Sequence, residues 1–250
     1  MPFLTARWSN LCLLTYAVPP GLLEPRLPRG LALDLRDGEA FASLVAFDFL
    51  DTKVLGIPWP GFRDFPEINL RFYVRQGDRR GVMFIREFVP QRWVALLART
   101  TYGEPYLAAP MRSRVTTTEG RLTVEHGLTY AGRENRLMVV GAEPAACPAE
   151  DSVEHFFKEH QWGFGGRPGG PCVRYEVAHP RWNCYAVERY ELDWDWAGVY
   201  GVEFGFLSGR EPVSARSLVT SMPTSPSVPT ITGRSIFLSP IFRLATRAIN

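Results

Sequence analysis

The chain has 250 residues, of which 46% are apolar and 13% aromatic, enough to bury a substantial core in one large β-rich domain. Its formal net charge of +2 is too small to suggest a protein that binds nucleic acid. No signal-peptide pattern and no run of about 20 apolar residues occurs, so we expect a soluble, cytoplasmic protein that does not enter a membrane.

Side chains suited to nucleophilic or metal chemistry are scarce. Lys53 and Lys158 are the two lysines among 28 basic residues, so amine nucleophiles are few. The four cysteines show no C-x-x-C spacing. His155 and His160 are five residues apart, which is not the i, i+4 spacing of a helical metal pair. We therefore predict neither a metal site nor a cofactor.

Strand patterns dominate the first part of the chain. Residues 10–18 form an apolar run, and residues 31–50 are typical of a hairpin that turns at Asp37-Gly38. Residues 67–75 alternate strictly between polar and apolar side chains. Residues 81–89 are apolar on both faces except at Arg86 and Glu87.

The period then changes. Residues 90–103 carry apolar side chains three and four positions apart, which predicts a helix, and residues 151–164 predict a second one. A hairpin is expected around Glu119-Gly120. Further strands are expected over residues 136–143, 173–180, 183–194 and 199–207. Residues 163–170 are glycine-rich but contain Pro168, which favours a flexible loop over a phosphate-binding loop.

The order of these elements predicts the fold class. Strands and helices do not alternate, so a doubly wound parallel sheet is disfavoured. We expect a single α+β domain over residues 1–220, built on a mostly antiparallel, β-barrel-like curved sheet with a few short helices. Residues 221–250 begin rich in Ser, Thr and Pro and end apolar. They predict a linker and a tail that either docks on the domain or a partner or stays disordered.

Polar side chains on two of the predicted strands are candidate ligand contacts. Glu67, Asn69, Arg71 and Tyr73 share one face of a strand, which is either exposed to solvent or lines a cavity. Arg86 lies among apolar neighbours, where a charge is costly to bury unless it is paired. It either forms a structural ion pair, for which Asp48 is available, or binds a carboxylate inside a pocket.

The third candidate is the sequence YGEPY, at the end of the predicted helix. Gly and Pro make a rigid corner that would aim Tyr106 in a fixed direction. Glu104 and the tyrosines could supply a proton acceptor and donors, although a tight structural turn is the alternative. The candidate catalytic residues are thus Glu67, Glu104 and Tyr106, and the candidate ligand-binding residues are Asn69, Arg71, Tyr73, Arg86 and Tyr102.

Motifs spread from about Thr5 to about Ser217 resemble those of the YqjF-like bacterial family, whose function is unknown. They include FLDTKVLGIPWP, FPEINLRFYVR, GVMFIREFVP and YGEPY, in that order. This family is similar to acetoacetate decarboxylase, in which a barrel-like sheet encloses a pocket and helices pack around it. The resemblance implies an acetoacetate decarboxylase-like fold with the site in its interior.

The chain departs from acetoacetate decarboxylase at one position of a motif that carries the catalytic lysine. Acetoacetate decarboxylase uses a pocket lysine as a Schiff-base nucleophile, in a motif similar to Gly-x-Pro-Lys. Gly103-Glu104-Pro105-Tyr106 fits this motif except at its last position, and a tyrosine cannot form an imine. We therefore predict that decarboxylation by this route is absent. Glu67, after Pro66, is the loose counterpart of a glutamate in the relative's pocket.

Three functions remain open at this point. The first is an interior pocket for a small acidic or carbonyl compound, with lyase, hydratase or isomerase chemistry that does not use an imine. The second is a non-catalytic ligand-binding or sensor protein on the same scaffold. The third is an interaction protein that acts through its C-terminal tail. The oligomeric state is also open, with a homo-oligomer among the options.

Overall fold

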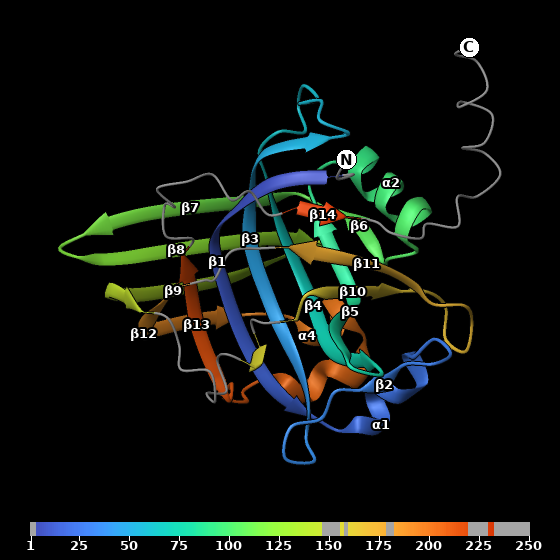
Figure 1. Cartoon of the computed structure of the whole chain (residues 1–250). Helices are drawn as coiled ribbons and strands as arrows, with labels where there is room; N and C mark the ends of the chain where they lie inside the picture. Colours follow the sequence, from blue (N-terminus) through green and yellow to red (C-terminus); the bar gives the residue numbers. More distant parts are fainter. Residues whose placement is uncertain (1–3, 147–155, 158–159, 179–182, 220–229, 233–250) are drawn as a thin grey trace, which may run out of the picture.

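A computed structural model describes residues 4–146, 156–157, 160–178, 183–219 and 230–232 (Figure 1). Most of them lie in one 14-stranded sheet. The strands are β1 (Leu4–Val18), β2 (Ala32–Leu33), β3 (Ala40–Val54), β4 (Phe65–Gln76), β5 (Arg79–Val89), β6 (Tyr106–Ala108), β7 (Met111–Thr118), β8 (Arg121–Tyr130), β9 (Arg133–Ala146), β10 (Trp162–Gly165), β11 (Val173–Ala178), β12 (Asn183–Asp193), β13 (Ser214–Val219) and β14 (Thr230–Thr232).

The helical elements are short. They are α1 (Pro20–Leu23), α2 (Arg92–Tyr102), α4 (Trp196–Tyr200) and the 3-10 turns η1 (Glu24–Arg26) and η2 (Val202–Leu207). The prediction of a sheet-dominated fold with a few short helices is confirmed. No helix within the described ranges combines the length and the hydropathy needed to cross a membrane.

The sheet is curved and mostly antiparallel. Its strands follow the order β14-β11-β10-β5-β4-β3-β1-β13-β12-β9-β8-β7, with β2 beside β4 and β6 beside β5. The pairs β10–β5 and β5–β6 are parallel. Strand β14 also pairs with the start of β1, but the sheet continues past β1 to β7, so the sheet as a whole is not closed as a barrel. The barrel-like prediction is corrected to a curved sheet.

The long central strands are buried on both faces. On β4, Ile68, Leu70 and Phe72 belong to the larger core cluster, which α4 and η2 help to cover. The alternate residues of β4 face a second cluster that includes Phe47 and Phe49 of β3. Because side chains alternate along a strand, β4 can contribute apolar side chains to the core on one face and polar side chains to a site on the other.

Two local predictions are wrong. The turn at Asp37-Gly38 forms with positive φ at both residues, but the strand before it, β2, pairs with β4 rather than with β3. Residues 199–207 are helical rather than extended, since Asp195 caps α4 through a hydrogen bond of 3.0 Å from Gly198 N.

Half of the second predicted helix, 151–164, lies outside the described residues. Phe156 and Phe157 are helical, but Trp162–Gly165 is strand β10, so the helix does not reach residue 164. The predicted tail also lies outside them, apart from residues 230–232. The helix around residue 93 and the hairpin at Glu119-Gly120 are confirmed as α2 and as the β7–β8 pair.

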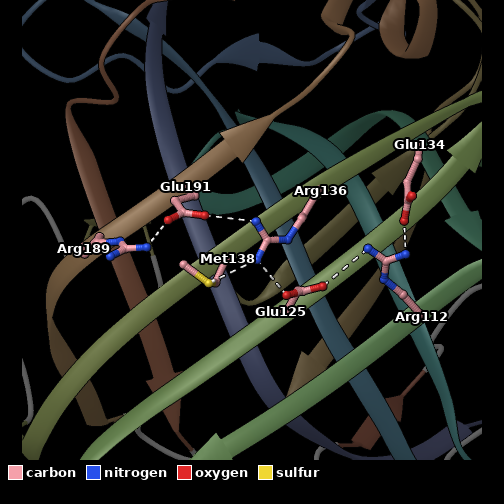
Figure 2. A network of polar contacts seen from close by, with 7 residues as sticks. All are labelled: Arg112, Glu125, Glu134, Arg136, Met138, Arg189 and Glu191. Carbon is pink, nitrogen blue, oxygen red and sulfur yellow. Dashed lines mark hydrogen bonds and ion pairs between the residues drawn. The ribbon is translucent and has the colours of Figure 1, made fainter.

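A ladder of alternating charges covers one face of β7, β8, β9 and β12 (Figure 2). Arg136 of β9 donates to Glu125 at 2.8 Å and to Glu191 at 3.0 Å. Arg112 and Arg189 extend the ladder at its two ends. These side chains lie at or near the surface, and their pairing keeps this face of the sheet polar.

Candidate functional site

The polar face of β4 lines a cavity. Glu67 and Asn69 are buried, with 3% and 2% of their surface exposed, and Arg71 is half-buried beside them. The inner cavity, as we call it, has a volume of about 90 Å³. Its walls come from β3, β4, β5, β6, β10 and β11 together with β1 and His160. The lining residues are Trp8, Leu11, Val45, Phe47, Phe49, Glu67, Asn69, Arg71, Val82, Phe84, Glu87, Tyr106, His160, Trp162, Gly163, Tyr175 and Val177.

The corner after α2 places Tyr106 in this cavity. Gly103 ends α2 in the left-handed conformation, at φ 67°, where glycine fits without strain. Pro105 then turns the chain, and its carbonyl accepts a hydrogen bond of 3.2 Å from Glu87 N. Strand β6 starts at Tyr106, which pairs in parallel with Glu87 of β5. The rigid corner thus sets Tyr106 beside β5 and in front of β4.

Glu67 is held by two donors. Asn69 Nδ2 donates to Oε1 at 2.8 Å, and the Tyr106 hydroxyl donates to Oε2 at 2.9 Å. Burial raises the pKa of the Glu67 carboxyl to about 7, although these two bonds and the charge of Arg71 act in the opposite direction. At neutral pH this carboxyl is therefore partly protonated and can both accept and donate a proton.

Two further carboxyl groups lie close to Glu67. Glu104 accepts a short hydrogen bond from the Tyr175 hydroxyl, and burial raises the pKa of Glu104 to about 8. Burial and the neighbouring charges of Glu104 and Glu67 raise the pKa of Glu87 well above its usual range. Glu87 Oε2 has no hydrogen-bond partner among the described residues. The site thus holds three acids that resist ionisation.

Arg71 is the one arginine among the described residues that line the inner cavity. Its Nη2 donates to the Phe157 carbonyl at 3.2 Å, while its Nε has no partner in the part of the chain that the structure describes. His160 Nε2 lies 2.9 Å from Asp34 Oδ2, and burial lowers the pKa of His160, so the ring is neutral at pH 7. Arg71 therefore supplies the positive charge of the cavity.

The remaining predicted residues do not join this group. Tyr73 does not line the inner cavity: its ring packs beside His160, and its hydroxyl and Ser43 Oγ share a hydrogen bond of 2.5 Å. Arg86 points to the other side of β5 and donates to the Val199 carbonyl. Asp48 does not pair with Arg86, because it accepts hydrogen bonds from Asn10 and Ser113 at 2.7 and 2.8 Å. Tyr102 is the last residue of α2, and its side chain lies outside the described parts of the structure.

Most of the cavity lining was not selected from the sequence, and Glu87, Gly163 and Tyr175 show why. Glu87 was visible as a charge in an apolar strand, but alternation allows only one of Arg86 and Glu87 to face the cavity, and the sequence does not say which. Gly163 belongs to β10 rather than to a flexible loop, and the Tyr175 ring packs on its Cα. No local signal marked Tyr175, which reaches the site through the β10–β11 pair.

The inner cavity adjoins a larger hollow. The outer cleft, as we call it, has a volume of about 360 Å³ and shares Phe49, Glu67, Tyr106 and Tyr175 with the inner cavity. Its walls come from α2 and from the connection between β3 and β4. Within the described residues, no group of three or more His, Cys, Asp or Glu side chains is arranged to hold a metal ion.

Sequence comparisons connect this chain to proteins of unknown function. It is 33% identical over 107 residues to the uncharacterized protein YqjF of Bacillus subtilis (strain 168). That match spans 42% of this chain and 44% of the length of YqjF, so the chain covers less than half of this curated relative.

Solved structures share the fold. An acetoacetate decarboxylase-like enzyme from Sphingomonas wittichii RW1 matches with a TM-score of 0.60 and 16% identity, over 87% of this chain and 89% of that one. The enduracididine biosynthesis enzyme MppR, complexed with pyruvate, matches with a TM-score of 0.60 and 15% identity, over 93% and 90%. At these identities the likeness concerns the fold alone.

The family model DUF2071, described as an uncharacterized conserved protein, matches residues 5–226. The chain therefore belongs to the DUF2071 family, and its fold is that of the acetoacetate decarboxylase-like proteins.

Proposed function

We propose that the inner cavity binds a small carbonyl compound and that Glu67 and Tyr106 transfer a proton to or from it without forming an imine. The observation that carries the proposal is the Glu67–Tyr106 hydrogen bond of 2.9 Å in a cavity whose walls are mostly apolar and aromatic side chains. A carboxyl group with a pKa of about 7 suits general acid–base catalysis at neutral pH.

Arg71 provides the second part of the mechanism. Its guanidinium lines the same cavity, and its free Nε–H can donate to a carboxylate or to a developing oxyanion of the ligand. Glu67 would then remove a proton from the carbon next to the carbonyl group while Arg71 stabilises the negative charge on oxygen. This division of roles corresponds to lyase, hydratase or isomerase chemistry.

The side chain at position 106 favours a route without an imine. A phenol replaces the amine of the Schiff-base mechanism, and Lys53 is exposed and lines neither hollow. The pyruvate complex of MppR supports a carbonyl ligand for this fold, although it concerns a protein only 15% identical. Tyr106 would hold Glu67 in position and share its proton rather than attack the ligand.

A sensor that binds the same ligand without reaction is the alternative, since both oxygens of Glu67 already accept hydrogen bonds from the protein's own side chains. Proton exchange separates the two functions. Pyruvate and longer 2-oxo acids are incubated with the protein in D₂O, and loss of the C3 proton is followed by NMR. We expect the wild-type protein to catalyse exchange. The exchange rate should fall about 100-fold or more in Glu67→Gln and should not change in Glu125→Gln.

Two results would contradict the proposal. Binding without exchange supports the sensor, and a lysine adduct after borohydride treatment shows an imine. Arg71→Met is expected to weaken binding of 2-oxo acids about tenfold or more, because a carboxylate held by arginine loses its charged donors.

A further inference from the structure

The outer cleft opens directly over the catalytic pair. It shares Glu67 and Tyr106 with the inner cavity, so the two hollows meet at these residues, which form part of the floor of the cleft. Glu104 and Tyr175, which are hydrogen-bonded to each other, complete that floor. A ligand bound at Glu67 can therefore extend outward into this second space.

The walls of the outer cleft are apolar, whereas its floor carries carboxyl and hydroxyl groups. Leu55, Ile57 and Trp59 come from the β3–β4 connection, and Trp93 and Leu97 come from α2. Among the described residues that line the cleft, the charged ones are Glu67 and Glu104, both on the floor. No arginine or lysine among them could neutralise a phosphate or carboxylate there, so the cleft does not suit an anionic group, and its apolar walls favour an uncharged one.

Several of these apolar side chains are largely exposed to solvent. Trp93 is 71% exposed, Leu55 55% and Trp59 53%. Contiguous exposed apolar surface around a hollow is a mark of binding sites. In Figure 1 the start of β1 and helix α2 lie at the same end of the molecule, and both contribute to the cleft.

The turn that presents Leu55 and Ile57 has a fixed shape. Val54 and Ile57 exchange two backbone hydrogen bonds of 3.0 Å. Leu55 holds a φ of 53°, a conformation that is unfavourable for a leucine, and Gly56 follows with a φ of 80°. Leu55 thus lines the cleft with its side chain half exposed, in a backbone conformation that has a cost for leucine.

We infer that the ligand is amphipathic: its carbonyl end occupies the inner cavity and an uncharged alkyl or aryl tail occupies the outer cleft, between the β3–β4 turn and α2. This inference rests on the proposed function and names the substrate class of the same site. A volume of about 360 Å³ lies within the range of sites for drug-sized molecules, roughly 300–1,000 Å³.

The test is a series of ligands with increasing chain length. Pyruvate, 2-oxohexanoate, 2-oxooctanoate and 2-oxodecanoate are titrated by calorimetry, with n-alkanols of matching length in parallel. We expect the Kd of the 2-oxo acids to fall about fourfold for each added CH₂ until the cleft is filled. Trp93→Ala and Leu97→Ala should each raise the Kd of the long acids about tenfold and leave the Kd of pyruvate unchanged.

Val202→Ala is the matched control, because Val202 is 87% exposed and does not line the cleft. If pyruvate binds but affinity does not depend on chain length, the inference is overturned while the proposed function stands. Chain-length dependence in the alkanols without binding of any 2-oxo acid supports the apolar cleft and contradicts the carbonyl site.

A flat response in both series overturns the inference outright. A shift in sedimentation coefficient in Trp93→Ala, together with a flat response, identifies the apolar surface as an interface between two copies of the chain.

Discussion

Two groups of glutamates in this protein have opposite properties. Glu67, Glu87 and Glu104 lie inside the cavity, where burial raises their pKa values. Glu125 and Glu191 lie in the ladder of Figure 2, where hydrogen bonds from Arg136 and its neighbours lower theirs. The residue type is the same, so the environment alone sets the sign. In the cavity the loss of hydration raises the pKa of the carboxyl groups, and at the surface pairing with arginine lowers it.

The difference also predicts how each group contributes to stability. An acid whose pKa is raised in the folded state ionises at a lower pH in the unfolded chain. As pH rises between the two pKa values, the free energy of unfolding therefore falls. An acid with a lowered pKa contributes above its usual pKa and loses that contribution as pH falls. The two groups therefore act in separate pH windows.

The largest expected effect concerns the cavity acids. Between pH 4.5, the usual value for glutamate, and about 7, Glu67 alone should lower the free energy of unfolding by on the order of 3 kcal/mol. Urea unfolding at pH 5, 6, 7 and 8 measures this slope. Glu67→Gln/Glu104→Gln should flatten it and make the protein more stable than wild type at pH 8. An unchanged slope in the double variant would show that these acids are solvated.

The second effect concerns space rather than charge. A methyl group at Gly163 would collide with the Tyr175 ring, whereas one at Gly127 would meet the Arg112 side chain, with its Cγ at 2.9 Å. Arg112 can move into solvent and Tyr175 cannot. We expect Gly163→Ala to destabilise the protein by about 1–3 kcal/mol and Gly127→Ala by less than about 1 kcal/mol. Equal losses in thermal unfolding would mean that the cavity wall is as pliable as the surface.

The third prediction is a substitution that stabilises the protein, whereas most substitutions of buried residues destabilise it. Glu87 is buried with one carboxyl oxygen unpartnered, so Glu87→Leu should stabilise the protein by about 1–2 kcal/mol at pH 8 and by less at pH 5. Glu125→Leu is the matched control on the ladder and should not stabilise. Destabilisation by Glu87→Leu at pH 8 would indicate that Glu87 has a partner in solution.

The smallest effect belongs to the ladder. Glu125→Gln removes one carboxylate from between Arg136 and Arg112, at 2.8 and 3.4 Å. Exposed ion pairs contribute little, so we expect a loss of at most about 1 kcal/mol, which 1 M NaCl should abolish. A larger loss that persists in salt would show that the ladder is shielded from water.

Several features could be predicted from the sequence because they depend on neighbours along the chain. Alternation in residues 67–75 placed Glu67, Asn69 and Arg71 on one face of a strand, and the glycine and proline of YGEPY predicted the corner before Tyr106. Side-chain direction in a strand and φ at glycine and proline are local properties. The replacement of an amine by a phenol at position 106 is likewise fixed by the sequence.

Only the tertiary structure decided what that polar face meets. Trp162, Gly163 and Tyr175 come from β10 and β11, about 90 residues or more further along the chain than Glu67, and they close the cavity. The same packing selected Glu87 over Arg86 and turned three ordinary carboxyl groups into acids that hold their protons. Burial is a property of the whole fold, and a raised pKa follows from burial, so neither can be derived from residue order alone.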